Sequence, residues 1–222
     1  MKTKLVSITK PLVEGINTPE EFITYCARVS NPTNQLNMET SDRLIAYLMK
    51  HKHWSPFEMV NVCVEIQTSR AIAAQILRHR SFSFQEFSQR YSKATELEPI
   101  EIRQQAVKNR QSSTDIFDPV LEHTDFGEVR YTSEIINDYL KGGQWLYEKL
   151  IKQGVAKESA RMVLPLTTQT TMYMNGSLRS WIHYLDIRCD EHTQKEHREI
   201  ALSIKELLEP EFPNVFKALV ND

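Results

Sequence analysis

The sequence is poor in cysteine and contains no long apolar run. Its three cysteines, Cys26, Cys63 and Cys189, are odd in number and widely spaced, which argues against a disulfide framework and against a cysteine-based zinc site. No apolar stretch approaches the roughly 20 residues that span a bilayer. The N-terminal MKTKLVSITK also lacks the apolar centre of a signal peptide. We therefore expect a cytoplasmic protein with reduced thiols and no membrane segment.

Features that would point to nucleic acid or to common nucleotide folds are also missing. The formal net charge is −2, so no global field attracts nucleic acid and any anion must be held by a local cluster. Neither G-x-G-x-x-G nor a P-loop occurs in the sequence, so a bound dinucleotide would have to be held by other means. Because no regular βαβ repeat is visible either, we do not expect a Rossmann fold.

What is present is the composition of an ordinary globular protein. Of the 222 residues, 41% are hydrophobic and 25% are charged, and this length suffices for one domain with a full core. Short β patterns are mixed with longer helical patterns without a regular repeat, which predicts an α+β or mixed α/β class. We expect a single domain over residues 1–222.

The clearest strand pattern is at residues 60–67, where Val60, Val62, Val64 and Ile66 alternate with polar residues, as in a half-buried strand. Further strands are expected at 4–8 and 167–174. Thr18 is the expected N-cap of the first helix, since a proline and two glutamates follow it. Other helices are expected over 40–50, 69–78, 129–153, 157–163, from a cap at 175–177 to about 189, and over 193–208.

Residues 96–127 are more polar than the rest of the chain. They are predicted to be part helix and part mobile loop. Arg103, Lys108 and Arg110 are interpreted as members of a solvated face.

Residues 75–92, QILRHRSFSFQEFSQRYS, combine cations, one carboxylate and aromatic rings. Arg78, His79, Arg80 and Arg90 surround Glu86, and serines, glutamines, phenylalanines and a tyrosine fill the gaps. Exposed aromatics would serve no purpose on a solvated face, and buried cations would need partners in a core strand. The stretch therefore predicts a pocket wall, with guanidinium groups for phosphate oxygens and aromatic planes for flat rings.

Several of these residues also have an ordinary structural interpretation. Arg78 and Arg90 are candidates for ion pairs with Glu86, and Arg188, near a predicted helix end, is a candidate counter-charge to the helix dipole. Ser88 resembles a nucleophile, but no histidine and carboxylate pair stands beside it in the sequence. Hydrogen bonding to a ligand is therefore the favoured interpretation of Ser88.

Other reactive groups suggest rival functions. Cys189 follows an arginine and is a candidate thiolate nucleophile, although inert cysteines are commoner. His51 and His53 lack a third ligand at a suitable spacing, and His192 and His197 are five residues apart, so no metal is expected. The rival functions are a nucleic-acid-binding module built on the arginine and aromatic stretch and a metal-dependent nucleotide phosphohydrolase.

The stretch from Arg78-His79-Arg80 through seven residues to Ser88 resembles the signature of the flavin-dependent thymidylate synthases. Met59 and Gln85 stand where many members of that family have histidine and asparagine. Other blocks of the sequence resemble the family's remaining blocks, in the same order: Ala27-Arg28-Val29-Ser30, His53-x-Ser55-Pro56-Phe57-Glu58, Arg90-Tyr91-Ser92, Ala160-Arg161-x-Val163-Leu164-Pro165, and Arg179-Ser180 through Arg188.

The resemblance implies a fold, an activity and an assembly. The implied fold is a central mixed sheet flanked by helices, in one catalytic domain. The implied reaction is the reductive methylation of dUMP to dTMP, with 5,10-methylenetetrahydrofolate as carbon donor and NADPH-reduced FAD as hydride donor. The implied assembly is a homotetramer whose active sites are shared between subunits, without nucleic acid or membrane partners.

The resemblance also assigns residues to ligands, and Arg188 matches the position that stabilises negative charge on the uracil ring. The dUMP-binding positions are Gln75, Arg78, Glu86, Ser88, Gln89, Arg90, Arg161 and Arg188. The FAD-binding positions are Ser30, Ser55, Arg78, His79, Arg80, Glu86, Asn175, Arg179 and His183. His53 matches a pocket position near flavin and folate.

Overall fold

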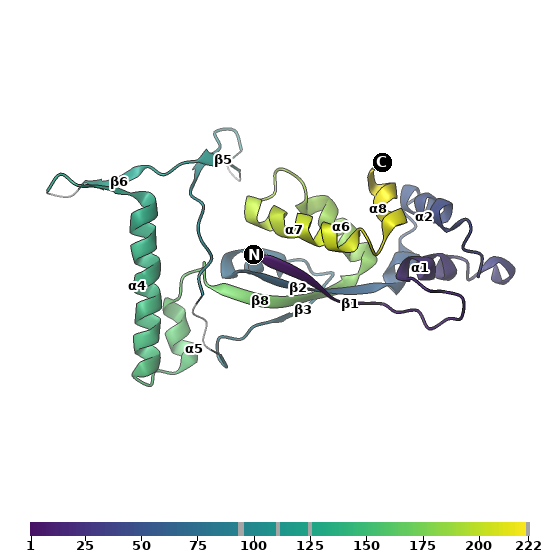
Figure 1. Ribbon diagram of the computed structural model, residues 1–222, viewed down its shortest axis with the longest axis horizontal. Coiled ribbons are helices and arrows are strands. Elements are labelled where there is room, and N and C mark those ends of the chain that lie inside the picture. Colours follow the sequence, from purple (N-terminus) through teal and green to yellow (C-terminus); the bar gives the residue numbers. More distant parts are fainter. Residues whose placement is uncertain (93–95, 110–111, 124–125, 221–222) are drawn as a thin grey trace.

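The computed structural model describes residues 1–92, 96–109, 112–123 and 126–220, and its body is built on one four-stranded sheet (Figure 1). The strands lie in the order β1 (Lys2–Ile8), β2 (Asn61–Ser69), β8 (Gln169–Ser177) and β3 (Ser83–Glu86). All three neighbouring pairs are antiparallel. The α+β class expected from the sequence is confirmed, but the described part of this sheet is antiparallel and not mixed.

β2 and β8 form the centre of the sheet and pair along their whole length. The alternation predicted for residues 60–67 is confirmed, because Val62, Val64 and Ile66 are fully buried while Asn61 is exposed. β8 runs three residues further than expected, so Asn175 lies within the strand, and only the last strand residue serves as the N-cap of the next helix.

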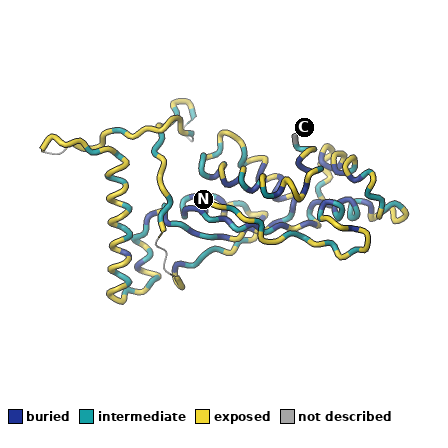
Figure 2. Tube along the Cα trace, in the orientation of Figure 1, coloured by how far each residue is buried: buried dark blue, intermediate teal, exposed yellow. Residues whose placement is uncertain are grey.

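Helices cover one face of this sheet and one of its ends. Figure 1 shows α6 (Leu178–Arg188) and α7 (Lys195–Leu208) over the sheet, with α1 (Pro19–Ala27), α2 (Ser41–Lys50) and α8 (Pro213–Val220) grouped at one end. The buried residues in Figure 2 follow the sheet and the helix faces turned toward it.

Trp181 of α6 lies in the middle of this core and is fully buried. Its indole N–H donates a hydrogen bond to the carbonyl oxygen of Val62 at 3.1 Å. Its ring lies edge-on to Phe82, with 4.8 Å between ring centroids, and contacts Tyr184 in the same way at 5.8 Å. One side chain thus joins α6, the central strand and the segment between α3 and β3.

The first helix begins as predicted, since the Thr18 hydroxyl accepts a hydrogen bond from the backbone N–H of Glu21 at 3.1 Å. The residue before Glu21, Glu20, has a second role that the sequence did not predict. Its buried carboxylate accepts hydrogen bonds from the N–H groups of Asn214 and Val215 at 2.8 and 2.9 Å. Glu20 therefore caps α8, a helix that the sequence did not predict, from almost two hundred residues away.

Between α3 (Arg70–Ile76) and β3 the chain turns and brings Phe82 against β8. A Cβ atom on Gly176 would lie 2.5 Å from Cδ1 of Phe82, so only glycine leaves room for the ring. This contact between Phe82 and Gly176 lies directly after the turn that carries Arg78, His79 and Arg80.

The remaining elements form an arm beside the body (Figure 1). β4 (Arg103–Gln105) pairs with β5 (Ser113–Ile116), and β6 (Val120–His123) pairs with β7 (Val129–Tyr131). The helix predicted within 96–127 is wrong for the described residues of that range, which form these short hairpins and loops. Arg110 lies outside the described residues, and Lys108 is exposed.

α4 (Thr132–Lys152) is the long helix of the arm. It begins three residues later than predicted, because residues 129–131 pair with β6, and it continues through Gly142 and Gly143 without a break. Tyr147 is its one fully buried residue, while Tyr139 and Trp145 are 69% and 59% exposed. Much of the surface of α4, including these two rings, is therefore uncovered in the single chain, and Figure 2 shows exposed residues along its whole length.

Three 3₁₀ helices and a short α-helix complete the chain. They are η1 (Pro32–Asn34), η2 (Ser55–Met59), η3 (Arg161–Val163) and α5 (Lys157–Ala160). The three cysteines are free thiols, and no helix in the described ranges combines the length and apolar character needed to cross a bilayer.

Candidate active site

A hollow of ≈ 670 Å³ lies where the end of α3, the end of α6 and the loop before α7 meet. Two of the sequence-predicted residues line it, namely Gln75 and Arg188. The others that line it are Asp186, Ile187, Asp190, His192, Thr193 and Gln194. The hollow therefore places one predicted nucleotide-binding amide and the predicted catalytic guanidinium on the same wall.

Arg188 is held in place by a histidine. Its Nε–H donates to Nε2 of His79 at 3.0 Å, so this ring nitrogen must carry a lone pair and not a proton. Burial and the nearby charge of Arg188 lower the pKa of His79, which keeps the imidazole neutral. Among the described residues no carboxylate forms an ion pair with Arg188, so its charge is available to a ligand in the hollow.

Gln75 is held by a second histidine. Nδ1 of the fully buried His197 lies 3.2 Å from Oε1 of Gln75, and Nε2 of the same ring lies 3.1 Å from the hydroxyl of Tyr184. Burial, followed by the charge of Arg188, lowers the pKa of His197 to about 4. His197 is therefore neutral near neutral pH and joins Gln75 to the core.

The other end of Gln75 connects to the arm. Its Nε2 donates to Oε1 of Gln194 at 2.7 Å, and Nε2 of Gln194 donates to Oε2 of Glu196 at 2.9 Å.

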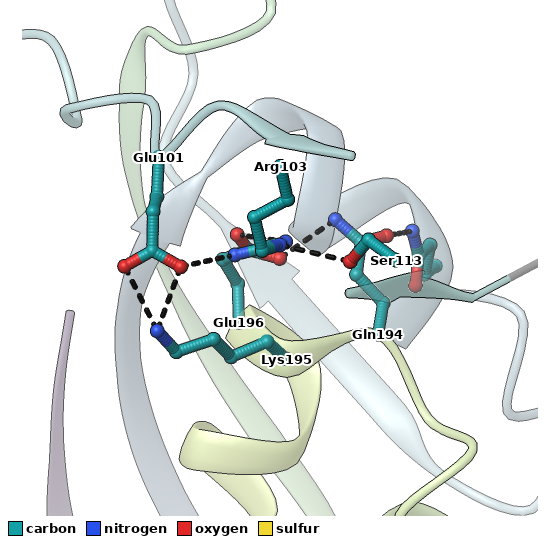
Figure 3. Close-up of polar contacts among 7 residues, drawn as sticks. Glu101, Arg103, Ser113, Gln194, Lys195 and Glu196 are labelled. Carbon is teal, nitrogen blue, oxygen red and sulfur yellow. Dashed lines mark hydrogen bonds and ion pairs between the residues drawn. The ribbon is translucent and has the colours of Figure 1, made fainter. Parts of the chain in front are cut away.

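Arg103 of β4 donates to Oε1 of Glu196 at 2.7 Å. Figure 3 shows this arginine between Glu196 and Glu101, and the Lys195 ammonium contacts both oxygens of the Glu101 carboxylate. The sequence interpretation of Arg103 as part of a solvated face is wrong, since its side chain is only 12% exposed.

Glu86 is paired, but not with the partners considered from the sequence. Nη1 of Arg70 lies 2.9 Å from Oε1 of Glu86, and the Thr170 hydroxyl donates to the same oxygen at 2.9 Å. The alternative interpretation of Arg78 and Arg90 as ion-pair partners of Glu86 is therefore wrong among the described residues. Arg78 is exposed at the turn after α3, beside the exposed Arg80.

A third set of predicted nucleotide residues lies near α5. Arg90 forms a long ion pair with Glu158 at 3.6 Å, and Nε of Arg161 donates to the carbonyl oxygen of Glu158 at 3.4 Å. The Ser88 hydroxyl accepts from the N–H of Arg90 at 3.4 Å, and Gln89 is buried. Among the described residues lining the hollow, none belongs to this set, so the predicted dUMP residues of one chain do not form a single site.

Three of the predicted flavin residues, Ser55, Arg179 and His183, lie on η2 and α6. Glu58 accepts hydrogen bonds from the Ser177 hydroxyl at 2.6 Å and from Arg179 at 2.7 Å, and these bonds lower its pKa. The His183 ring lies 5.2 Å from the Trp54 ring, centroid to centroid. Ser55 begins η2 in the same region.

Three other predicted positions are exposed. Ser30 lies in the turn after α1, and Asn175 lies on β8 opposite Ser83. His53 is near Tyr47 and His51, with ring centroids 6.0 and 6.1 Å away. Among the described residues no group of three or more histidine, cysteine, aspartate or glutamate side chains is arranged to hold a metal ion.

Sequence reasoning missed several residues that organise the hollow. Tyr184, Gln194 and Glu196 were not singled out, and His197 was considered only as a metal ligand. Their roles depend on contacts between α3, α6 and α7, which no local sequence pattern reveals. Cys189 was a candidate thiolate, but burial raises the pKa of its thiol, which makes it a poor nucleophile.

The profile of the family described as "Thymidylate synthase complementing protein" matches residues 11–214. The chain is 50% identical over 222 residues to a flavin-dependent thymidylate synthase of Synechocystis sp., with 99% of each chain covered. It is 48% identical over 220 residues to a probable flavin-dependent thymidylate synthase of Paramecium bursaria Chlorella virus 1, again with 99% of each covered.

A solved structure has the same fold. The crystal structure of the UMP/dUMP methylase PolB from Streptomyces cacaoi, bound with 5-Br dUMP, superposes with a TM-score of 0.79 and 22% sequence identity. It covers 99% of this chain and 94% of that chain. The match to the family profile and the full-length identity to both relatives show that the chain belongs to the flavin-dependent thymidylate synthase family.

Proposed function

We propose that the hollow beside Gln75 and Arg188 is the pyrimidine nucleotide site of this enzyme. The chain is a flavin-dependent thymidylate synthase, and it converts dUMP to dTMP. FAD is its cofactor, and NADPH and 5,10-methylenetetrahydrofolate are its co-substrates. We further propose that residues 1–222 form one catalytic domain and that the enzyme acts in the cytoplasm, in keeping with its free thiols.

One observation carries the assignment of the site. Arg188 faces the hollow without a carboxylate partner among the described residues, and the neutral His79 fixes its Nε. Methylation at uracil C5 requires electron density on that carbon, and a cation beside the ring stabilises the negative charge that develops. Because a guanidinium stays charged at any working pH, Arg188 supplies an electrostatic stabiliser and not a general base.

The residues around η2 and α6 fit a flavin nucleotide. Arg179 offers a cation for a phosphate, and the neighbouring rings of Trp54 and His183, tilted by 57° to each other, offer aromatic contacts. When bound, FAD supplies the hydride that reduces the transferred carbon. Arg179 and Arg188 are nine residues apart on α6, which is about 14 Å along the axis, so an extended ligand is needed to contact both ends of the helix.

The separation of the predicted dUMP residues supports shared active sites. Gln75 and Arg188 line the hollow, whereas Ser88, Arg90 and Arg161 gather near α5. We propose a homotetramer in which the hollow of one subunit is completed by the second group from another subunit. The uncovered apolar side of α4 supplies a surface for such an assembly.

We expect the purified protein to have about four times the 25.9 kDa mass of one chain in light scattering after gel filtration. Replacing Tyr139 and Trp145 together with glutamate should reduce this mass, because both side chains are exposed on α4 in the single chain. Leu12→Glu is the matched control, since Leu12 is 92% exposed on the body of the molecule. A tetramer that survives the double substitution would remove α4 from the interface.

The activity is tested by the visible spectrum of the purified protein. We expect an oxidised-flavin band that bleaches under anaerobic NADPH, faster when dUMP is present, followed by dTMP formation once the folate is added. A protein that binds no flavin even after incubation with FAD would contradict the proposed cofactor site, and a flavin that dUMP does not affect would contradict the proposed nucleotide site.

A further inference from the structure

The amide of Gln75 belongs to a chain of hydrogen bonds that has a defined direction. The chain runs through five side chains, in the order Glu196, Gln194, Gln75, His197 and Tyr184. Amides and neutral imidazoles can each be turned around in such a chain, so their orientation depends on a group that cannot be reversed. Glu196 is that group.

A carboxylate only accepts hydrogen bonds. Although burial would raise the pKa of Glu196, its own backbone N–H, Gln194 and Arg103 lower it by more, and the net pKa lies below the usual value. Arg103 also only donates, and it occupies Oε1 of Glu196 at 2.7 Å. The remaining oxygen, Oε2, must therefore receive an N–H from Gln194 (Figure 3).

The donor and acceptor roles of the side chains that follow, as far as the hollow, are fixed in the same way. Because Gln194 uses its N–H group on Glu196, its Oε1 faces Gln75 and must accept. Gln75 therefore donates through Nε2, and its Oε1 accepts from Nδ1–H of His197. The imidazole then accepts from the Tyr184 hydroxyl at Nε2. Any reversed amide would place two oxygens or two N–H groups face to face and would lose a hydrogen bond of this network.

We propose that the Arg103–Glu196 ion pair sets the orientation of Gln75, so that its amide N–H group is the hydrogen-bond donor presented to the bound nucleotide. One N–H of the Gln75 amide is used by Gln194, and no described residue accepts the second, which can reach an oxygen atom of the ligand. Arg103 and Glu196 are positioning residues in this scheme, since they act through Gln194 and not on the ligand. The inference rests on the proposed nucleotide site.

The test is a double-mutant cycle on dUMP affinity, measured by calorimetry with the FAD-loaded protein. Glu196→Gln is neutral and nearly isosteric, but its amide can either donate or accept. The series of hydrogen bonds that ends at Tyr184 then no longer has one fixed donor-to-acceptor direction. We expect dUMP to bind about tenfold more weakly to this variant, as for the loss of one hydrogen bond, with kcat at saturating dUMP largely retained. In a Gln75→Ala background the same Glu196→Gln change should have no further effect.

The comparison in the Gln75→Ala background distinguishes a role of Glu196 in orienting Gln75 from a general structural role. A purely structural role for Glu196 would weaken dUMP binding by the same factor with and without Gln75, because the two changes would then be additive. Additivity, or an unchanged affinity in the single Glu196→Gln variant, would overturn the inference while leaving the proposed function intact. Failure of the unmodified protein to bind dUMP would overturn the proposed function itself.

Arg103→Met tests the other member of the pair, and it too should weaken dUMP binding in a Gln75-dependent way. Arg130→Met is the matched control, because Arg130 also lies in the arm and also forms ion pairs, with Asp138 and Glu122. Its partners do not connect to Gln75. If both arginine variants weaken dUMP binding equally, the effect belongs to the arm as a whole and the assigned role of Arg103 is wrong.

Discussion

Replacing Arg188 with alanine should lower kcat for thymidylate formation by about 10²- to 10³-fold while leaving FAD bound. That factor is typical when one preorganised stabiliser of a developing negative charge is removed from an active site. Arg188 lines the hollow, and the residues proposed to hold the flavin gather around η2 and the start of α6, at the opposite end of that helix. The visible flavin band should therefore survive the substitution, and stopped dTMP assays would measure the loss.

Two further variants define the cause of this loss. Arg188→Lys keeps the charge but loses the forked geometry and the Nε–H that His79 receives, so we expect most of the loss to remain. Arg198→Ala is the control for removing an arginine near the site. The Arg198 guanidinium donates to the carbonyl oxygen of Glu191 and lines a neighbouring hollow without reaching that of Arg188. Full turnover by Arg188→Ala would exclude Arg188 from the mechanism.

Replacing Trp181 with alanine should cost about 3–5 kcal/mol of folding free energy, the range seen when a large buried aromatic side chain is truncated. Trp181 is fully buried, and its ring contacts Phe82 and Tyr184. The loss comes from the cavity left behind and from the carbonyl of Val62, which would lose its hydrogen bond from the indole. Urea unfolding at one fixed protein concentration is the measurement, since assembly makes apparent stability concentration-dependent.

Trp181→Phe separates the two contributions. The phenyl ring refills most of the cavity but cannot donate to Val62, so we expect a smaller loss, of about 1–3 kcal/mol. Equal losses for the alanine and phenylalanine variants would mean that the hydrogen bond, and not the packing of the ring, accounts for the stability.

Local patterns predicted those parts of the fold that depend on local chemistry. The alternation at residues 60–67 and the cap at Thr18 each depend on neighbours within a few positions, and both are confirmed. The helix α8 was missed because its cap is Glu20, far away in the chain. The helix predicted within 96–127 was wrong because polar residues with weak periodicity are compatible with hairpins as well as with helices.

Only part of the candidate site could be predicted, because several of its contacts join residues that are far apart in the sequence. The resemblance supplied residues by type and order, and the structure brings Gln75, His79 and Arg188 together at the hollow. It does not bring Ser88, Arg90 or Arg161 there in one chain. The partner of Glu86 could not be read from nearby arginines, because Arg70 reaches it from the start of α3.

The contact between Gly176 and Phe82 imposes an order on substitutions during the divergence of this chain from its relatives. A methyl group at position 176 would lie 2.5 Å from the phenyl ring, so alanine there is tolerated only after position 82 has become smaller. The reverse order is permitted, since a smaller residue at 82 leaves a cavity beside glycine, which costs stability but creates no clash. The two positions should therefore change as a pair, with the ring shrinking first.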